Sequence, residues 1–167
     1  LFWGVQTLRQ ILDGARGRTL QGVRIRDWPN QDIRGVHLDM KYMFQKPSAV
    51  EDWLRDLAAL KLNAALFEYE DKFPYGRYRF LRADSAMTPA RLRRVLETAR
   101  RYHIDVIPLV QSLGHLEFCL RHEPLAHLRE GPDIYTQACP TNPASLEFVR
   151  DLMDEVLAYH PDVPYFH

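Results

Sequence analysis

The side chains best suited to chemistry in this sequence follow three short apolar segments, which we predict to be strands. His37, Asp39 and Lys41 belong to the first segment, Glu68, Glu70 and Asp71 follow the second, and Gln111, His115 and Glu117 follow the third. In a sheet of parallel strands such positions meet at the carboxyl edge, where (β/α) barrels build their active sites. The pattern therefore predicts a polar site at one edge of a parallel sheet.

Asp39 and Lys41 stand two residues apart in an extended segment, so their side chains share a face. A carboxylate acceptor beside a charged donor is well suited to binding sugar hydroxyls. A salt bridge across the mouth of the site explains the same pair equally well. The two residues alone leave both interpretations open.

Three carboxylates lie within four residues at Glu68, Glu70 and Asp71. The neighbouring aromatic residues are Phe67, Tyr69, Phe73 and Tyr75. Aromatic rings can stack on the apolar face of a pyranose, so this composition is typical of a carbohydrate site. A solvated charged loop is the alternative, although the position directly after a buried strand favours a functional role.

A turn at Gly114 places the imidazole of His115 at the end of the third segment, where it could orient a carboxylate or donate to a ligand. His37, on the first strand itself, is expected to be a hydrogen-bonded core residue. His122 and His127 lack the helical His-x-x-x-His spacing of a zinc site. We expect neither a metal site nor a cofactor.

From residue 34 onward strands and helices are predicted to alternate, which is typical of a parallel sheet with crossover helices. The strands are expected at 36–40, 64–69 and 104–110 with a short fourth at 164–167, and the helices at 47–62, 89–102 and 143–160. We therefore predict an α/β fold that is the N-terminal part of a (β/α)8 TIM barrel, incomplete and with about four strands. Periodicity alone also allows an open doubly wound sheet, but no glycine-rich turn follows the first strand, which argues against nucleotide binding.

The first 30 residues are predicted to be the end of a preceding small α/β domain, and residues 31–167 the N-terminal half of the catalytic barrel. A helix is expected over residues 3–12, and Val23 and Ile25 alternate with arginines as in a half-buried strand. On the barrel helices, Glu51, Asp154 and Glu155 fall outside the apolar stripes and are expected to be surface charges.

The composition excludes several classes of partner. The 167 residues include 22 Lys or Arg and 22 Asp or Glu, so no net charge favours nucleic acid or an acidic membrane surface. Hydrophobic residues make up 46% of the chain, as in folded proteins, and no apolar run is long enough to span a membrane. We expect a neutral or small ligand, no nucleic acid and no membrane; the compartment and the oligomeric state are left open.

Four stretches of the chain carry a resemblance to glycoside hydrolase family 20, the β-N-acetylhexosaminidases, and most closely to its hexosaminidase D branch. The stretches are 34–39 (RGVHLD), 68–75 (EYEDKFPY), 108–118 (PLVQSLGHLEF) and 141–143 (TNP). The opening 3–8 (WGVQTL) also resembles the final helix of the small domain that precedes the barrel in this family. The resemblance implies that Asp39, Asp71, His115 and Asn142 bind the substrate or support the site.

The resemblance also implies a reaction: removal of terminal β-linked N-acetylhexosamine by substrate-assisted retaining catalysis, with the acetamido carbonyl as nucleophile. In the family, the Asp-Glu pair that orients the amide and protonates the leaving oxygen follows the fourth strand. We expect this pair just after His167, so that the chain contains no catalytic residue and is inactive alone. The sequence departs from the common pattern at Tyr42, where other members have arginine, and at Gln111, where they have an acidic residue.

Two alternatives stay open at this point. One is a non-catalytic carbohydrate-binding barrel relative that has lost the acid. The other is a glycosidase of a different barrel family, with two enzyme carboxylates drawn from Glu68, Glu70 and Glu117.

Overall fold

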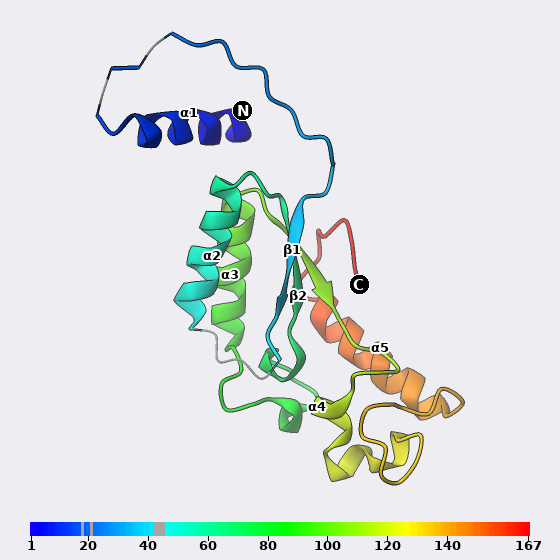
Figure 1. Ribbon diagram of the computed structural model, residues 1–167. Helices are drawn as coiled ribbons and strands as arrows, with labels where there is room; N and C mark the ends of the chain where they lie inside the picture. Colours follow the sequence, from blue (N-terminus) through cyan, green and yellow to red (C-terminus); the bar gives the residue numbers. More distant parts are fainter. Residues whose placement is uncertain (18, 21, 42–45) are drawn as a thin grey trace.

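A parallel sheet of three strands organises the computed structural model, which describes residues 1–17, 19–20, 22–41 and 46–167. The strands are β1 (Gly35–Asp39), β2 (Ala64–Glu68) and β3 (Asp105–Leu109), in the order β1-β2-β3 (Figure 1). Asp39 pairs with Glu68, and Glu68 pairs with Leu109. The strand ends therefore form one aligned row, as predicted from the three apolar segments.

Three long helices connect or follow the strands: α2 (Pro47–Ala59), α3 (Pro89–Arg101) and α5 (Pro143–Leu157). Each begins with proline, which has no N–H to leave unpaired in the first turn. The Thr88 hydroxyl accepts a hydrogen bond from the Arg91 N–H and so caps α3. Short elements at the carboxyl side are α4 (Glu117–Leu120) and the 3₁₀ turns η1 (Glu70–Lys72), η2 (Arg79–Leu81) and η3 (Glu123–Leu128).

The hydrophobic core lies between one face of the sheet and these helices. Phe67 of β2 and Val106 of β3 are buried together with Leu54 of α2, Leu92 of α3 and Leu152 of α5. Successive strand residues point to opposite faces, so the residues that alternate with these core residues, among them Asp39 and Glu68, lie on the other face. The sheet thus has a helix-covered face and a face that carries the polar side chains.

The amino edge of the sheet is fixed by hydrogen bonds between the chain before β1 and the turn before β2. The Asn63 side chain accepts from the Arg34 N–H at 2.8 Å and donates to the Asp32 carbonyl at 2.8 Å. The Arg34 guanidinium donates to the Lys61 carbonyl at 3.0 Å. These contacts set where β1 begins relative to β2.

Helix α1 (Phe2–Ala15) confirms the predicted N-terminal helix and lies beyond the amino edge of the sheet, whereas α4 lies beyond the opposite edge (Figure 1). It contacts α2 through the Gln10 amide, which donates to the Ala59 carbonyl. Among the described residues, no helix is long and apolar enough to pass through a bilayer.

The strand predicted at Val23 and Ile25 is wrong. No ladder forms there in the described part of the chain, and the side chains are 68% and 48% exposed. Alternation alone does not make a strand, because the backbone also needs a paired neighbour. The helix expected to reach residue 62 ends at Ala59, and Leu60, assigned to its apolar stripe, is 69% exposed.

Two acidic residues expected at the surface have structural partners instead. Glu51 is 4% exposed and lies 3.2 Å from the Arg94 guanidinium across the α2–α3 interface. Glu155 accepts hydrogen bonds from the backbone N–H groups of Gly76 and Arg77, which ties α5 to the loop after β2. Only the exposed Asp154 matches the prediction.

The fourth strand expected at 164–167 is not assigned as a strand. His167 nevertheless donates to the Pro108 carbonyl, and its own carbonyl accepts from Val110, both at 3.0 Å. Two such bonds to residues on either side of Leu109 are the pattern of a parallel neighbour. The chain thus reaches the free edge of β3 at its last residue.

Gly35 at the start of β1 permits a close approach to β2. A β-carbon at this position would stand 3.0 Å from both the Cβ and the carbonyl oxygen of Ala64. We expect Gly35→Ala to lower the free energy of unfolding by about 1–3 kcal/mol, because paired backbone cannot yield without disturbing the register. Urea denaturation followed by tryptophan fluorescence measures the change. The control is Gly14→Ala in α1, where a β-carbon meets nothing within 4 Å; an equal loss in both variants would contradict the steric explanation.

A buried pair links the residue after β2 to the turn that follows α5: the Tyr69 hydroxyl lies 3.0 Å from the His160 Nε2. Burial, with a smaller contribution from Arg100, lowers the pKa of His160 from 6.5 to about 4. The unfolded chain therefore takes up this proton first as the pH falls from 6.5 to 4, and stability is lost in that window. When the pH is lowered from 7 to 4.5, we expect the free energy of unfolding of His160→Gln to fall by about 2 kcal/mol less than that of the wild type. The exposed His127→Gln serves as the control, and parallel stability curves for wild type and His160→Gln would exclude the linkage.

Candidate functional site

Lys41 occupies the centre of the polar cluster at the carboxyl edge. Its ammonium lies 3.0 Å from the Glu70 carboxylate and 3.6 Å from that of Glu68. The ion pairs at the mouth involve Lys41 with Glu68 and Glu70 and not with Asp39, whose carboxylate accepts from the Lys41 backbone N–H at 2.8 Å. The lysine side chain therefore pairs with the end of β2, and Asp39 stabilises the turn that follows β1.

Glu68 is buried at 5% exposure, yet it is surrounded by donors. The Gln111 amide donates to its Oε1 at 2.6 Å, and the His37 Nε2 lies 3.0 Å from its Oε2. His37 was expected in the core, but its side chain is 43% exposed on the polar face of the sheet. The sequence signal for this placement was the two-residue spacing between His37 and Asp39, which puts both on one face.

Glu70 is the most perturbed carboxyl of the cluster. Its backbone has φ of 45°, in the left-handed region that costs free energy for any residue with a β-carbon, and its side chain is buried. Burial raises the pKa of Glu70 to about 7, against the opposing effect of Lys41. Burial alone would lower the pKa of Lys41, but the contacts with Glu70 and Glu68 raise it overall. A carboxyl group that titrates near neutrality can both donate and accept protons under physiological conditions.

Asp71 follows in the η1 turn and faces a different neighbour. It accepts from the Lys72 ammonium at 2.6 Å and lies 3.4 Å from the Arg121 guanidinium, just after α4. Sequence reasoning missed Arg121, since the long loop after β3 carries no pattern that predicts its path. The pairing joins the loop after β2 to the loop after β3.

His115 and Glu117 lie in the loop that follows β3. His115 is exposed and adopts a left-handed backbone with φ of 55°. Glu117 opens α4. Two of the nine candidate residues, Glu70 and His115, thus hold a conformation that non-glycine residues rarely adopt and that clusters at functional sites.

Asn142 serves as the N-cap of α5. Its side-chain oxygen accepts from the Ala144 N–H at 3.0 Å, and its amide donates to the His127 carbonyl at 2.9 Å. Both polar atoms of the side chain are therefore engaged with backbone groups. In this structure Asn142 positions the loop and helix after β3.

The aromatic residues expected to stack on a sugar do not line the edge. Phe67, Tyr69, Phe73 and Tyr75 are all 2% exposed or less and form ring-to-ring contacts in the core. Phe67 alternates with Glu68 because β2 sends every second residue to the helix-covered face, whereas Tyr69, Phe73 and Tyr75 follow the strand and pack into the core from the loop. Tyr42, the other departure from the family pattern, lies outside the described residues.

Other reactive groups of the described residues give no second chemistry at this edge. Cys119 is buried beneath the site, and burial together with the charge of Glu70 raises the pKa of its thiol far above the physiological range. Within residues 1–17, 19–20, 22–41 and 46–167, no three His, Cys, Asp or Glu side chains converge as metal ligands would.

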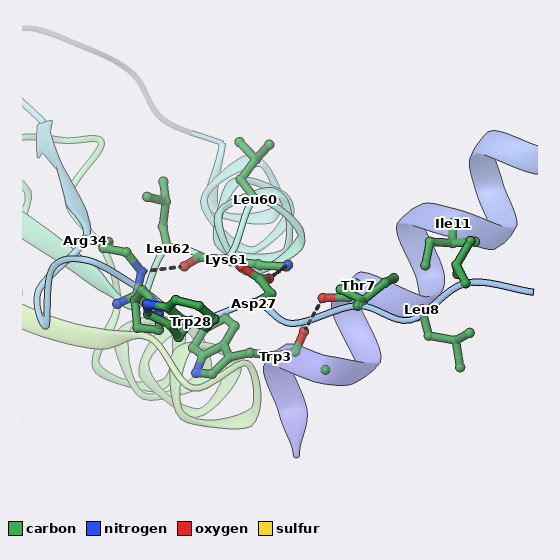
Figure 2. Close-up of a pocket in the computed structure, with 14 residues that line it drawn as sticks. Trp3, Thr7, Leu8, Ile11, Asp27, Trp28, Arg34, Leu60, Lys61 and Leu62 are labelled. Carbon is green, nitrogen blue, oxygen red and sulfur yellow. Dashed lines mark hydrogen bonds and ion pairs between the residues drawn. The ribbon is translucent and has the colours of Figure 1, made fainter.

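A cavity of about 640 Å³ lies at the opposite, amino edge of the sheet. Figure 2 shows Trp3, Leu8 and Ile11 of α1 facing Trp28 and the turn at residues 60–62 across it. Its lining is mostly apolar, with the ion pair of Asp27 and Lys61 at one side. The carboxyl edge has more converging polar groups and buried charges, so we place the candidate site there and not at this cavity.

Comparison with known proteins gives concordant matches. Residues 1–28 match the family model described as glycosyl hydrolase family 20, domain 2. Hexosaminidase D from Bos taurus is 41% identical over 136 residues, covering 81% of this chain and 39% of the relative. Hexosaminidase D from Homo sapiens is 40% identical over 136 residues, covering 81% of this chain and 28% of the relative. The chain thus spans well under half the length of these relatives.

Solved structures show the same fold. A mutant Streptomyces plicatus beta-hexosaminidase in complex with its product GlcNAc superposes with a TM-score of 0.80, at 22% identity, over 99% of this chain and 39% of that chain. Flavobacterium johnsoniae chitobiase gives a TM-score of 0.75, at 24% identity, over 99% of this chain and 28% of that chain.

An α/β chain with buried carboxylates at the carboxyl edge of a parallel sheet, and with these relatives, falls in the class of glycoside hydrolases. The chain belongs to glycoside hydrolase family 20, and its resemblance to the hexosaminidase D branch is confirmed. Membership of this family contradicts the alternative of a glycosidase from a different barrel family.

The perturbed ionisation of Glu70 has a measurable effect on stability. Between pH 4.5 and 7 the folded chain holds a proton that the unfolded chain releases, so stability decreases as the pH rises through this window. We expect Glu70→Gln to remove this decrease, a difference of roughly 2–3 kcal/mol between pH 4.5 and 8. Unfolding free energies at several pH values measure it. The exposed Glu97→Gln on α3 is the matched control, and a wild-type pH dependence retained in Glu70→Gln would assign the effect to another group.

Proposed function

We propose that this chain is part of a β-N-acetylhexosaminidase that removes terminal β-linked N-acetylhexosamine from a glycan. The observation that carries the proposal is the gathering of Asp39, Lys41, Glu68 and Glu70 at one edge of the sheet in a chain 41% identical to Hexosaminidase D. The carbohydrate substrate is further supported by the GlcNAc product bound to the related Streptomyces plicatus enzyme.

The fold in the longer protein is proposed to be a (β/α)8 barrel whose N-terminal half is residues 31–167, preceded by a small domain that ends near residue 30. Support comes from three parallel strands with their helices packed on one face. The hydrogen bonds of His167 to Pro108 and Val110 support a fourth strand that continues from this point. In such a barrel the polar face of the sheet becomes the interior, and its carboxyl edge becomes the mouth.

The proposed reaction is substrate-assisted and retaining: the acetamido carbonyl of the sugar attacks the anomeric carbon, so no enzyme carboxylate acts as nucleophile. An aspartate that orients this amide and a glutamic acid that protonates the leaving oxygen are proposed to follow His167 in the longer protein. Protonation of the leaving group in the transition state, and stabilisation of the charge that develops, are the two contributions expected from such a pair.

The residues of this chain are proposed to bind the sugar and to support that pair. Asp39, which ends β1 at the rim, is proposed to accept from sugar hydroxyls, and the exposed His115 is proposed to orient a neighbouring carboxylate. Asp71, held by Lys72 and Arg121, supports the same rim from the loop after β2. Gln111, Glu117 and Asn142 complete the loop after β3.

The test uses a chain extended past His167 to the length of its relatives. We expect it to hydrolyse a chromogenic N-acetyl-β-hexosaminide, with inhibition by a thiazoline that mimics the cyclised intermediate. Asp39→Asn should lower kcat/KM by roughly 10- to 100-fold, the effect of losing a hydrogen bond to a charged group.

The matched control is Asp52→Asn, because Asp52 lies exposed on α2 and pairs with Arg55 away from the rim. It should leave kcat/KM unchanged. If the extended protein folds and binds N-acetylhexosamine but does not hydrolyse the substrate, the enzyme proposal is contradicted and the protein is a carbohydrate-binding relative.

A further inference from the structure

Lys41 holds two carboxylates that the fold has removed from water. The side chains of Glu68 and Glu70 are each 6% exposed, whereas that of Lys41 is 22% exposed. Both carboxylates therefore have little access to solvent, and a nearby cation favours their ionised forms. Lys41 is the lysine or arginine that contacts them among the described residues.

The Lys41 ammonium is shared as an ion-pair partner between two buried carboxylates, 3.0 Å from Glu70 and 3.6 Å from Glu68. Glu68 has additional donors in Gln111 and His37. Glu70 has Lys41 as its charged partner and also a left-handed backbone that needs compensation from its surroundings. The contact with Lys41 is thus the interaction that fixes where the Glu70 carboxyl group lies.

We propose that Lys41 is a positioning residue, which links Glu68 to Glu70 and presents the Glu70 carboxyl group to the sugar, and that it is not itself the sugar ligand. This inference rests on the proposed function and assigns a role within the same site. It differs from the expectation that Lys41 grips the hydroxyls directly. The occupied ammonium group and the buried carboxylates at 3.0 and 3.6 Å carry the distinction.

The charged groups that act on Glu70 are Lys41, Glu68 and Asp39, at the ends of β1 and β2. Glu70 in turn acts on Tyr75 in the following loop and on Cys119 of α4. Lys41 is the cation of this set, and it lowers the pKa of Glu70 while burial and the neighbouring carboxylates raise it. Loss of the lysine charge should therefore move the titration of Glu70 to higher pH.

The direct test is an NMR titration of this chain with 13C-labelled glutamate side chains, in which Glu70→Gln assigns the resonance. We expect Lys41→Met to move the Glu70 midpoint upward by roughly one pH unit or more, the usual effect of an opposite charge at this distance. Lys41→Arg should restore most of the wild-type midpoint. Lys61→Met, which removes a lysine at the opposite edge of the sheet, should leave it unchanged.

A reciprocal titration covers the case in which Lys41→Met does not fold. Proton binding at two coupled groups is mutual, so Glu70→Gln should lower the pKa of Lys41, read from its Cε resonance. A Glu70 midpoint that does not respond to Lys41→Met, or a Lys41 midpoint that does not respond to Glu70→Gln, overturns the proposal.

Turnover gives the functional readout in the extended chain. A positioning role predicts that Lys41→Met shifts the pH profile of kcat/KM in the same direction as the Glu70 midpoint, with rescue by Lys41→Arg. A direct ligand role predicts a raised KM with an unshifted profile, which would contradict the proposal. Absence of hydrolysis by the extended wild type would contradict the proposed function instead, and the NMR titration would still decide the role of Lys41.

Discussion

The parallel register of the three strands is the constraint on which the site depends. It aligns Asp39, Glu68 and Leu109 in one row and brings His167 beside the last of them. Because side chains alternate along a strand, a slip of one residue would exchange Glu68 for Phe67 or Tyr69 on the polar face. The hydrogen bonds of Asn63 at the amino edge therefore fix the position of carboxylates at the other end of the sheet.

Burial of these carboxylates is costly unless donors replace the lost water. Glu68 at the end of β2 receives them from His37 and Lys41, in and just after β1, and from Gln111, which follows β3. The site is thus also a polar connection across the sheet. The apolar face obtains its cohesion from helix packing, whereas the polar face obtains it from charge and hydrogen bonding, so the same strands serve both purposes.

The strands, helices and the location of the polar edge could be predicted from the sequence, because apolar runs and proline starts record local preferences. Partners could not. Val23 and Ile25 alternate as a strand would, but alternation does not show whether another strand pairs with them, and none does among the residues that the structure describes. Glu51 was expected at the surface because helical periodicity reports only which positions are apolar. It gives no information on Arg94, the ion-pair partner on the neighbouring helix. The contact of Asp71 with Arg121 likewise depends on the path of a loop that has no period.

Glu70 and His160 exchange protons in opposite directions when the chain folds. The raised pKa of Glu70 makes the folded chain take up a proton that the unfolded chain lacks, while the lowered pKa of His160 makes it give one up. At about pH 5.5 the two contributions nearly cancel. Folding enthalpies measured by calorimetry at this pH would therefore contain little heat of buffer ionisation from these two groups, even though the pKa of each is far from its ordinary value.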